Sequence, residues 1–358
     1  MKKTVLCAAV LCAMASSSWA QSAVTVYGIV DSGVRVDTNS GPAGAHSGDN
    51  NKTVTAGGMS QSRLGFRGTE DLGGGMAGMF NMEHRFSADT GTYPAEFWRQ
   101  AWVGLKTNYG AVYLGRQYNV LFDATTSTYA SFRYSPYIEI FKPEIGMSLG
   151  ARTSNTIKYV FETGGLRVGL AASAGEQAAT GGSSRGGYVR YQSGPFMAAA
   201  ATETLKDGAY NKVTTTTVGG AYESGPIVLS AGWAKTDPDA HFSRAILASL
   251  LANGGTNGGF GISTNLDQRT MFMFGGGYQL TPQLNLGAHY WHAKQDSLPT
   301  FNDADGTAKF AAVVADYALS KRTDVYLEAD KTNLGKKLVF ANGETSRAGY
   351  MVGIRHRF

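Results

Sequence analysis

The 358-residue sequence contains only two cysteines, Cys7 and Cys12, and both fall within its first twenty residues. Those residues are predicted to be a cleavable secretory signal peptide, because two lysines precede an apolar run at 5–15 and a small-x-small site, Ser-Trp-Ala, ends at residue 20. The expected mature chain, 21–358, has no thiol. Disulfides, thiolate metal sites and cysteine nucleophiles are therefore excluded, and stability must come from a large core or a closed hydrogen-bonded framework.

Long apolar runs and an excess of one charge are also missing. A membrane-spanning helix needs about 20 apolar residues, whereas the run in the leader is roughly half that length and no later run approaches it. The 32 Lys and Arg residues, less the two in the leader, leave 30 basic residues against 27 acidic ones. This near-neutral balance argues against a nucleic-acid partner.

Glycine is abundant, with 47 residues, while proline is scarce, with nine. Apolar residues recur in short alternating stretches that are bounded by Gly, Asn, Asp, Ser or Pro, and this pattern is typical of many antiparallel strands joined by turns. A helical period is hard to find outside residues 245–252. The composition therefore indicates an all-β chain.

Short turns and long polar segments alternate along the chain. The short turns fall near 69–74, 107–110, 162–165, 193–195, 224–226, 280–282 and 320–323. The long segments are 37–58, 87–97, 118–152, 174–186, 204–212, 235–269, 294–307 and 331–346. Seven turns and eight long loops, with both termini on the turn side, predict a closed sixteen-stranded antiparallel transmembrane β-barrel over 21–358 as a single domain.

The last eleven residues alternate strictly, with apolar side chains on one parity and two arginines on the other. The apolar face, which includes Tyr350, Val352, Ile354 and Phe358, is expected to meet lipid and to serve as a C-terminal assembly signal. Every backbone group must be paired in hydrocarbon, so the first strand, 24–31, is expected to pair with the last. A barrel of this width leaves an aqueous channel.

Aromatic residues are grouped close to the predicted short turns and the C-terminus. They are expected to form one interfacial girdle, with each ring at the acyl boundary. Its members would be Tyr109, Tyr159, Phe161, Tyr191, Tyr222, Tyr278, Tyr317 and Phe358. The alternative is the ordinary β-propensity of aromatic residues.

Several stretches together resemble motifs of the Gram-negative general porins, the trimeric sixteen-stranded diffusion pores. The stretches are Val24–Asp31, Ser62–Gly75, Trp98–Leu105, Tyr113–Gln117, Asn155–Tyr159, Tyr317–Thr323 and Gly353–Phe358. The resemblance implies that the third long loop, 118–152, folds inward and narrows the barrel opposite a wall of arginines. The residues that match this basic wall are Arg63, Arg99, Arg116 and Arg152.

The resemblance also implies acidic residues on the inward loop. Glu144, in Pro-Glu-Ile-Gly, matches the family's acidic turn, and either Asp123 or Glu139 is a candidate for the second acidic position. Strand parity independently predicts that Arg63 and Arg116 point into the lumen, because an arginine on the lipid face at mid-depth costs about 2–4 kcal/mol. The alternative is that some of these arginines only brace the wall through carboxylates such as Glu83.

The predicted function is passive diffusion of small hydrophilic solutes and ions, with a preference for anions set by the lumenal arginines. No catalytic site, metal site or cofactor is expected, because His289 and His292 point to opposite faces of one strand and no hydrolase or phosphate-binding motif is present. The alternatives are a solute-specific channel and a structural or adhesive outer-membrane barrel. The expected partners are two further copies in a homotrimer, outer-membrane lipid and lipopolysaccharide, and the barrel-assembly machinery.

Overall fold

The computed structural model describes residues 23–40, 49–93, 97–129, 147–175, 182–252, 265–299, 305–340 and 342–358. The predicted signal peptide therefore lies outside the described residues. The strands are β1 (Ala23–Asp37), β2 (Asn51–Thr55), β3 (Arg63–Gly73), β4 (Met76–Arg85), β5 (Trp98–Thr107), β6 (Gly110–Tyr118), β7 (Arg152–Thr163), β8 (Leu166–Ser173), β9 (Ser184–Ser193), β10 (Phe196–Lys206), β11 (Lys212–Ser224), β12 (Ile227–Pro238), β13 (Leu266–Gln279), β14 (Leu284–Ser297), β15 (Gly306–Ala318), β16 (Thr323–Lys336) and β17 (Ser346–Arg357).

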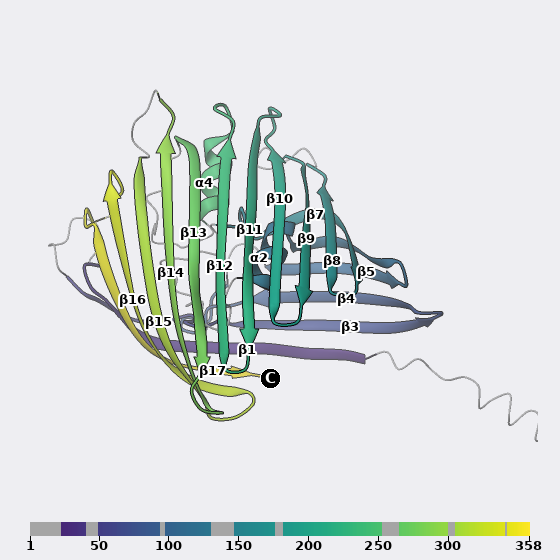
Figure 1. Ribbon diagram of the computed structural model, residues 1–358, viewed down its shortest axis with the longest axis horizontal. Coiled ribbons are helices and arrows are strands. Elements are labelled where there is room, and N and C mark those ends of the chain that lie inside the picture. Colours follow the sequence, from purple (N-terminus) through teal and green to yellow (C-terminus); the bar gives the residue numbers. More distant parts are fainter. Residues whose placement is uncertain are drawn as a thin grey trace, which may run out of the picture.

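These strands form one closed antiparallel barrel with sixteen strand positions. From β3 onward each strand pairs with the next along the chain, and β17 pairs with β1. The strands β2 and β3 share one position, because β2 pairs with residues 33–37 of β1 and β3 pairs with residues 23–29. Figure 1 shows β1 and β3–β5 crossing β8–β14 at a steep angle, as the opposite walls of a barrel with strongly tilted strands do. The predicted fold is confirmed.

The interruption between β2 and β3 was not predicted from the sequence, which assigned 37–58 to a loop. Residues 56–62 instead turn into the barrel, where the Asp31 carboxylate accepts hydrogen bonds from the backbone N–H groups of Gly58 (3.2 Å) and Ser60 (2.6 Å). Met59 is buried in a cluster with Tyr326 and Met351. The chain therefore leaves the second strand position for seven residues and returns to it at Arg63.

Closure of the barrel takes place between the first and last strands, as predicted. Residues 29–37 of β1 face residues 357–349 of β17, and Gly28 and Phe358 exchange two backbone hydrogen bonds of 3.1 Å. Side chains reinforce the junction from inside, since the hydroxyl of Tyr326 donates to Asp31 (2.6 Å) and Arg35 forms an ion pair with Asp330 (2.7 Å).

Seven short turns and eight longer connections join the strands, which confirms the predicted alternation. The turn between β7 and β8 consists of Gly164 and Gly165, whose φ angles of 54° and 85° suit the two central positions of a type I′ hairpin. Six of the eight predicted girdle aromatics are between 37% and 83% exposed near the short-turn edge of the barrel, namely Tyr109, Tyr159, Tyr191, Tyr278, Tyr317 and Phe358.

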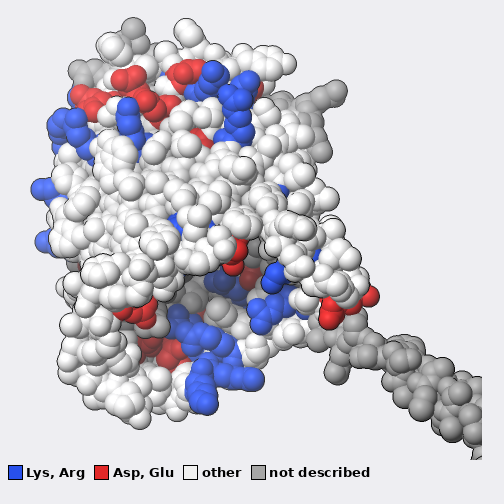
Figure 2. Space-filling view, turned by 45° about the vertical axis from the view of Figure 1, so that its right-hand side comes forward, with Lys and Arg blue, Asp and Glu red and all other residues white. Residues whose placement is uncertain are grey.

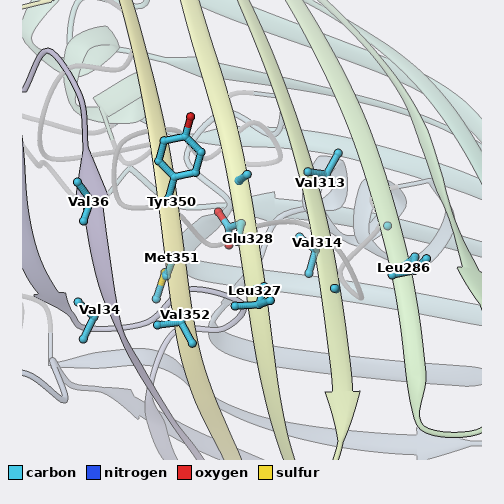
Figure 3. Close-up of a pocket in the computed structure, with 13 residues that line it drawn as sticks. Val34, Val36, Leu286, Val313, Val314, Leu327, Glu328, Tyr350, Met351 and Val352 are labelled. Atoms are coloured by element: carbon cyan, nitrogen blue, oxygen red, sulfur yellow. The ribbon is translucent and has the colours of Figure 1, made fainter.

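The outer face of the barrel is apolar and the inner face carries most of the buried polar groups. On the outside, β1 and β14–β17 form a shallow groove of about 770 Å³ whose lining is almost entirely aliphatic (Figure 3). Tyr350, Val352, Ile354 and Phe358 all lie on this outer face and are about half exposed. Such an apolar surface on a folded chain indicates contact with lipid or with another subunit.

Two helices, α2 (Val120–Thr128) and α4 (Arg244–Ala252), lie in the third and sixth long connections. Asn119 caps α2 by accepting a hydrogen bond from the N–H of Phe122 (2.8 Å). The apolar faces of α2 and α4 pack together against the inner wall, in a cluster that includes Leu121, Leu247 and Ala201. The sequence predicted a helical segment for α4 but not for α2. No described helix is long and apolar enough to cross a membrane.

Asp207 joins two of the outer connections. Its carboxylate accepts hydrogen bonds from the backbone N–H groups of Ala209, Asn211 and Ser243, each of 2.9 Å. Burial alone would raise the pKa of Asp207, but these hydrogen bonds and one from the Asn211 side chain outweigh it and hold the pKa below its ordinary value of 3.8.

The lowered pKa of Asp207 predicts that the contact between these connections weakens in acid. A carboxyl group with a depressed folded pKa contributes its stability above its unfolded pKa and loses it as the pH falls through the folded value. Hydrogen exchange, corrected for its intrinsic pH dependence, is expected to show protection of the Asn211 and Ser243 amides at pH 6 and a loss of protection well below pH 4. Asp207→Asn should lower the protection at pH 6 and remove its pH dependence. Equal protection in both proteins at every pH would contradict the role of Asp207.

Candidate pore constriction

Arg63 and Arg99 lie on the inner wall beside Glu83. Arg63 begins β3, Glu83 lies in β4 and Arg99 lies in β5. The register of the pairing between β4 and β5 shifts between Glu83 and His84. The Arg99 Nε lies 3.3 Å from Glu83 Oε1, and the Arg63 Nη1 lies 3.9 Å from Glu83 Oε2. Tyr27 also donates to Glu83 (3.1 Å). Glu83 therefore braces the two arginines, as the alternative interpretation of the sequence allowed.

Arg152 completes this group from the far side of the inward loop. It begins β7 directly opposite Tyr118, the last residue of β6, and its guanidinium lies 5.1 Å from the centre of the Tyr118 ring. Arg99 Nη2 donates to the Tyr118 hydroxyl (3.0 Å). Arg63, Arg99 and Arg152 are therefore grouped around Glu83 and Tyr118. We call these three residues the arginine wall.

Arg116 does not belong to the arginine wall, so the prediction that it points into the lumen is wrong. It pairs with Ala101 and shares its side of β6 with Val112 and Leu114, which are exposed on the outer face. Its Nε donates to the Trp98 carbonyl (3.0 Å) and its Nη1 to the Ser154 hydroxyl (2.8 Å). A charge costs little at this position, because Arg116 lies near the long-loop end of the strand, beyond the hydrocarbon core of the membrane.

Asp123 lies in the first turn of α2 and faces the wall at Lys158. The Lys158 Nζ donates to Asp123 Oδ2 (2.6 Å) and to the backbone carbonyl of Tyr118 (3.1 Å). Sequence reasoning did not identify Lys158, although it alternates with Ile157 and Tyr159 and so has the parity of a lumenal residue. The other two acidic candidates, Glu139 and Glu144, lie outside the described residues.

The inward loop crosses the lumen and packs on the opposite wall. Tyr129, at the end of α2, shares a short hydrogen bond with the Thr217 hydroxyl, and its ring lies over Gly219 and Gly232. A Cβ atom at Gly219 would lie 2.4 Å from the ring, so a glycine is required for this close approach. Arg190 of β9 further holds the loop by donating to the Ser127 carbonyl (3.0 Å).

A buried apolar cluster receives the loop on that wall. The loop is described over residues 118–129 and 147–152. Tyr129 and Met147, the last and first residues of these two parts, pack with side chains of β12–β16 that include Met273, Trp291 and Phe310. The described parts of the loop therefore pack on the wall formed by β9–β16, whereas the arginine wall belongs to β3, β5 and β7. His289, which sequence parity placed on the opposite face from His292, is buried beside Trp291.

Comparisons with known proteins agree with this architecture. A family described as Gram-negative porin matches residues 7–336. Outer membrane porin protein 32 of Delftia acidovorans is 30% identical over 384 residues, and an outer membrane porin protein of Bordetella pertussis is 28% identical over 409 residues; in both cases 100% of each chain is covered.

Among solved structures, an anion-selective porin from Comamonas acidovorans matches with a TM-score of 0.74 and 26% sequence identity, over 94% of this chain and 100% of its own. The family match, the relatives covered along their whole length and the closed barrel with an inward loop all agree. The chain belongs to the Gram-negative porin family and is an outer-membrane channel for passive diffusion.

Proposed function

We propose that this porin conducts small hydrophilic anions in preference to cations and that the arginine wall sets this preference. The observation that carries the proposal is the convergence of Arg63, Arg99 and Arg152 on one side of the lumen, with Glu83 as the carboxylate among them. The Arg152 side chain makes no hydrogen bond or ion pair with any described residue, and it stacks on the Tyr118 ring instead. A guanidinium stacked in this way can still donate hydrogen bonds from its edge to a passing anion.

The expected preference is moderate. Two unit charges 4 Å apart interact by about 1 kcal/mol in water, and physiological salt screens charges beyond about 8 Å. A few fixed cations therefore bias which ions enter without binding them tightly. The solved relative named as anion-selective supports the same sign. We expect no turnover of the solute, because the sequence holds no hydrolase or phosphate-binding motif.

Planar bilayers test this proposal directly. The purified protein in a potassium chloride gradient is expected to give stable single-channel steps and a reversal potential of the sign that chloride preference requires. A cation-selective reversal potential would overturn the proposed anion preference, and the absence of any conductance would overturn the open channel.

We also propose that the porin assembles as a homotrimer after removal of residues 1–20. The long apolar groove on β1 and β14–β17 offers a surface that lipid, lipopolysaccharide or a neighbouring subunit would cover (Figure 3). One of the solved outer membrane proteins that share this fold is described in a trimer form. The mass of the mature chain and of its complex in mild detergent tests both points.

The outer face of β17 is proposed to be the part that the barrel-assembly machinery recognises. Tyr350, Val352, Ile354 and Phe358 remain on the lipid side of the closed barrel, so they would be accessible on the unpaired strand as well. Replacing Phe358 by serine should lower the yield of folded barrel in the outer membrane if this assignment is right, and an unchanged yield would contradict it.

A further inference from the structure

The pairing at the closure of the barrel extends the basic surface beyond the arginine wall. Ile29 of β1 lies directly opposite Arg63 of β3 on one side and directly opposite Arg357 of β17 on the other. Directly opposed residues of antiparallel strands project from the same face. Because neighbouring strands lie about 4.8 Å apart, Arg63 and Arg357 start roughly 10 Å from each other on the lumen side.

These two arginines line a polar cavity of about 740 Å³ at the short-turn end of the barrel. Four cationic side chains line it against two carboxylates, so its lining carries an excess of two positive charges. The cationic residues are Arg63, Lys321, Arg355 and Arg357, and the acidic residues are Asp316 and Asp324. Figure 2 shows a hollow in the lower part of the molecule with Lys and Arg side chains along part of its border.

The cationic side chains of this cavity differ in how many ion pairs and hydrogen bonds they already make within the protein. Arg355 is buried and bonds to Asp324 (3.0 Å), to Asp316 (3.4 Å) and to the Ser60 hydroxyl (2.9 Å). The Arg357 side chain pairs with Asp324 through one nitrogen but is 40% exposed. Lys321 makes no ion pair with any residue of the described part of the chain.

We propose that this cavity is a second station for small oxyanions, that is, solutes with carboxylate or phosphate groups. The inference rests on the proposed anion preference and adds a site to it. Arginine suits such a ligand, since its planar fork donates two parallel hydrogen bonds to one oxyanion, and a lysine nearby adds a mobile charge. Arg63 belongs to both the arginine wall and the cavity. An anion that passes the arginine wall therefore enters the cavity without crossing a region of lower positive electrostatic potential.

The consequence is a dependence on the side of addition. Phosphate that enters from the short-turn side meets this station first, whereas phosphate from the long-loop side must first pass the constriction. The concentration that halves the chloride current of a single channel is therefore expected to be lower when phosphate is added on the short-turn side.

The experiment compares two neighbouring substitutions that remove the same charge. Lys321→Gln should raise the half-blocking phosphate concentration on the short-turn side by about fivefold, which corresponds to one charge at about 4 Å in water. Arg357→Gln should act in the same direction. Arg322→Gln, in the same turn but outside the cavity lining, should leave the concentration unchanged.

Three results would overturn the inference. If Lys321→Gln and Arg322→Gln behave alike in a channel whose reversal potential still shows anion preference, the second station is wrong and the proposed function stands. If the wild-type channel prefers cations, both are wrong. Equal block from the two sides in the wild type counts against the station as well.

Discussion

Replacing Arg63 and Arg152 together by glutamine is expected to lower the chloride-to-potassium permeability ratio by about fivefold or more. The two guanidinium groups each contribute on the order of 1 kcal/mol to an anion about 4 Å away, while Glu83 remains with Arg99 as its ion-pair partner. Neither substitution removes a fully buried charge, because the Arg63 side chain is 20% exposed and Arg152 is partly exposed. The reversal potential in a potassium chloride gradient measures the change.

Arg116→Gln is the matched control for this double variant. It also removes a guanidinium from the same region of sequence, but Arg116 bonds to Trp98 and Ser154 on the outer side of β6. Its reversal potential should equal that of the wild type. An effect of Arg116→Gln as large as that of Arg152→Gln alone would show that total charge, and not the arginine wall, decides the preference.

Tyr129→Ala is expected to release the inward loop and to widen the channel. The ring is fully buried, and truncation of a buried aromatic costs about 3–5 kcal/mol. The strand pairs of the barrel do not depend on this contact, and the Thr217 hydroxyl keeps the Trp233 carbonyl as an acceptor (3.0 Å). Single-channel conductance should therefore rise, and liposome swelling should admit larger sugars, while the barrel stays folded.

Tyr109→Ala provides the control for the loss of a tyrosine. Tyr109 lies in the turn between β5 and β6 and is 83% exposed, so its removal should leave conductance and the sugar size limit unchanged. Heat-dependent mobility in detergent gels reports whether each variant retains the barrel. If Tyr129→Ala keeps the barrel and conducts like the wild type, the Tyr129 contact does not hold the loop across the lumen.

The barrel could be predicted because the alternation of side chains within each strand indicates which of its faces meets lipid. In residues 348–358 the alternation of apolar and polar side chains is strict, and the structure places every second side chain on the lipid side. The seven turns were found for the same local reason, since glycine marks five of them and proline or a cluster of polar residues marks the other two. Closure followed from the requirement that no strand edge stay unpaired in hydrocarbon.

The constriction was predictable only in part, because parity fixes a face of the sheet and not a depth or a partner. Arg116 shares its parity with Val112 and Leu114, which face outward, whereas the sequence prediction took the Tyr113 side of β6 as the lipid face. Glu83 was named from the sequence as a candidate partner of the arginines, whereas Lys158 pairs with Asp123, which is distant in sequence, and a single sequence does not show such a pair. The inward turn at 56–62 depends on the Asp31 carboxylate and is equally invisible to local patterns.

The pairing of β1 with β17 has a consequence for chain connectivity. Ala23, where the described part of the chain begins, and Phe358 both lie on the short-turn side, and Gly28 and Phe358 are joined by backbone hydrogen bonds like those of other paired strands. The backbone pairing of β1 with β17 therefore does not differ in kind from that of the other neighbouring strands. The chain should therefore tolerate circular permutation. A linker that spans residues 23–27 would join the two present ends, new ends would be opened in one of the long connections, and the permuted chain should form the same barrel.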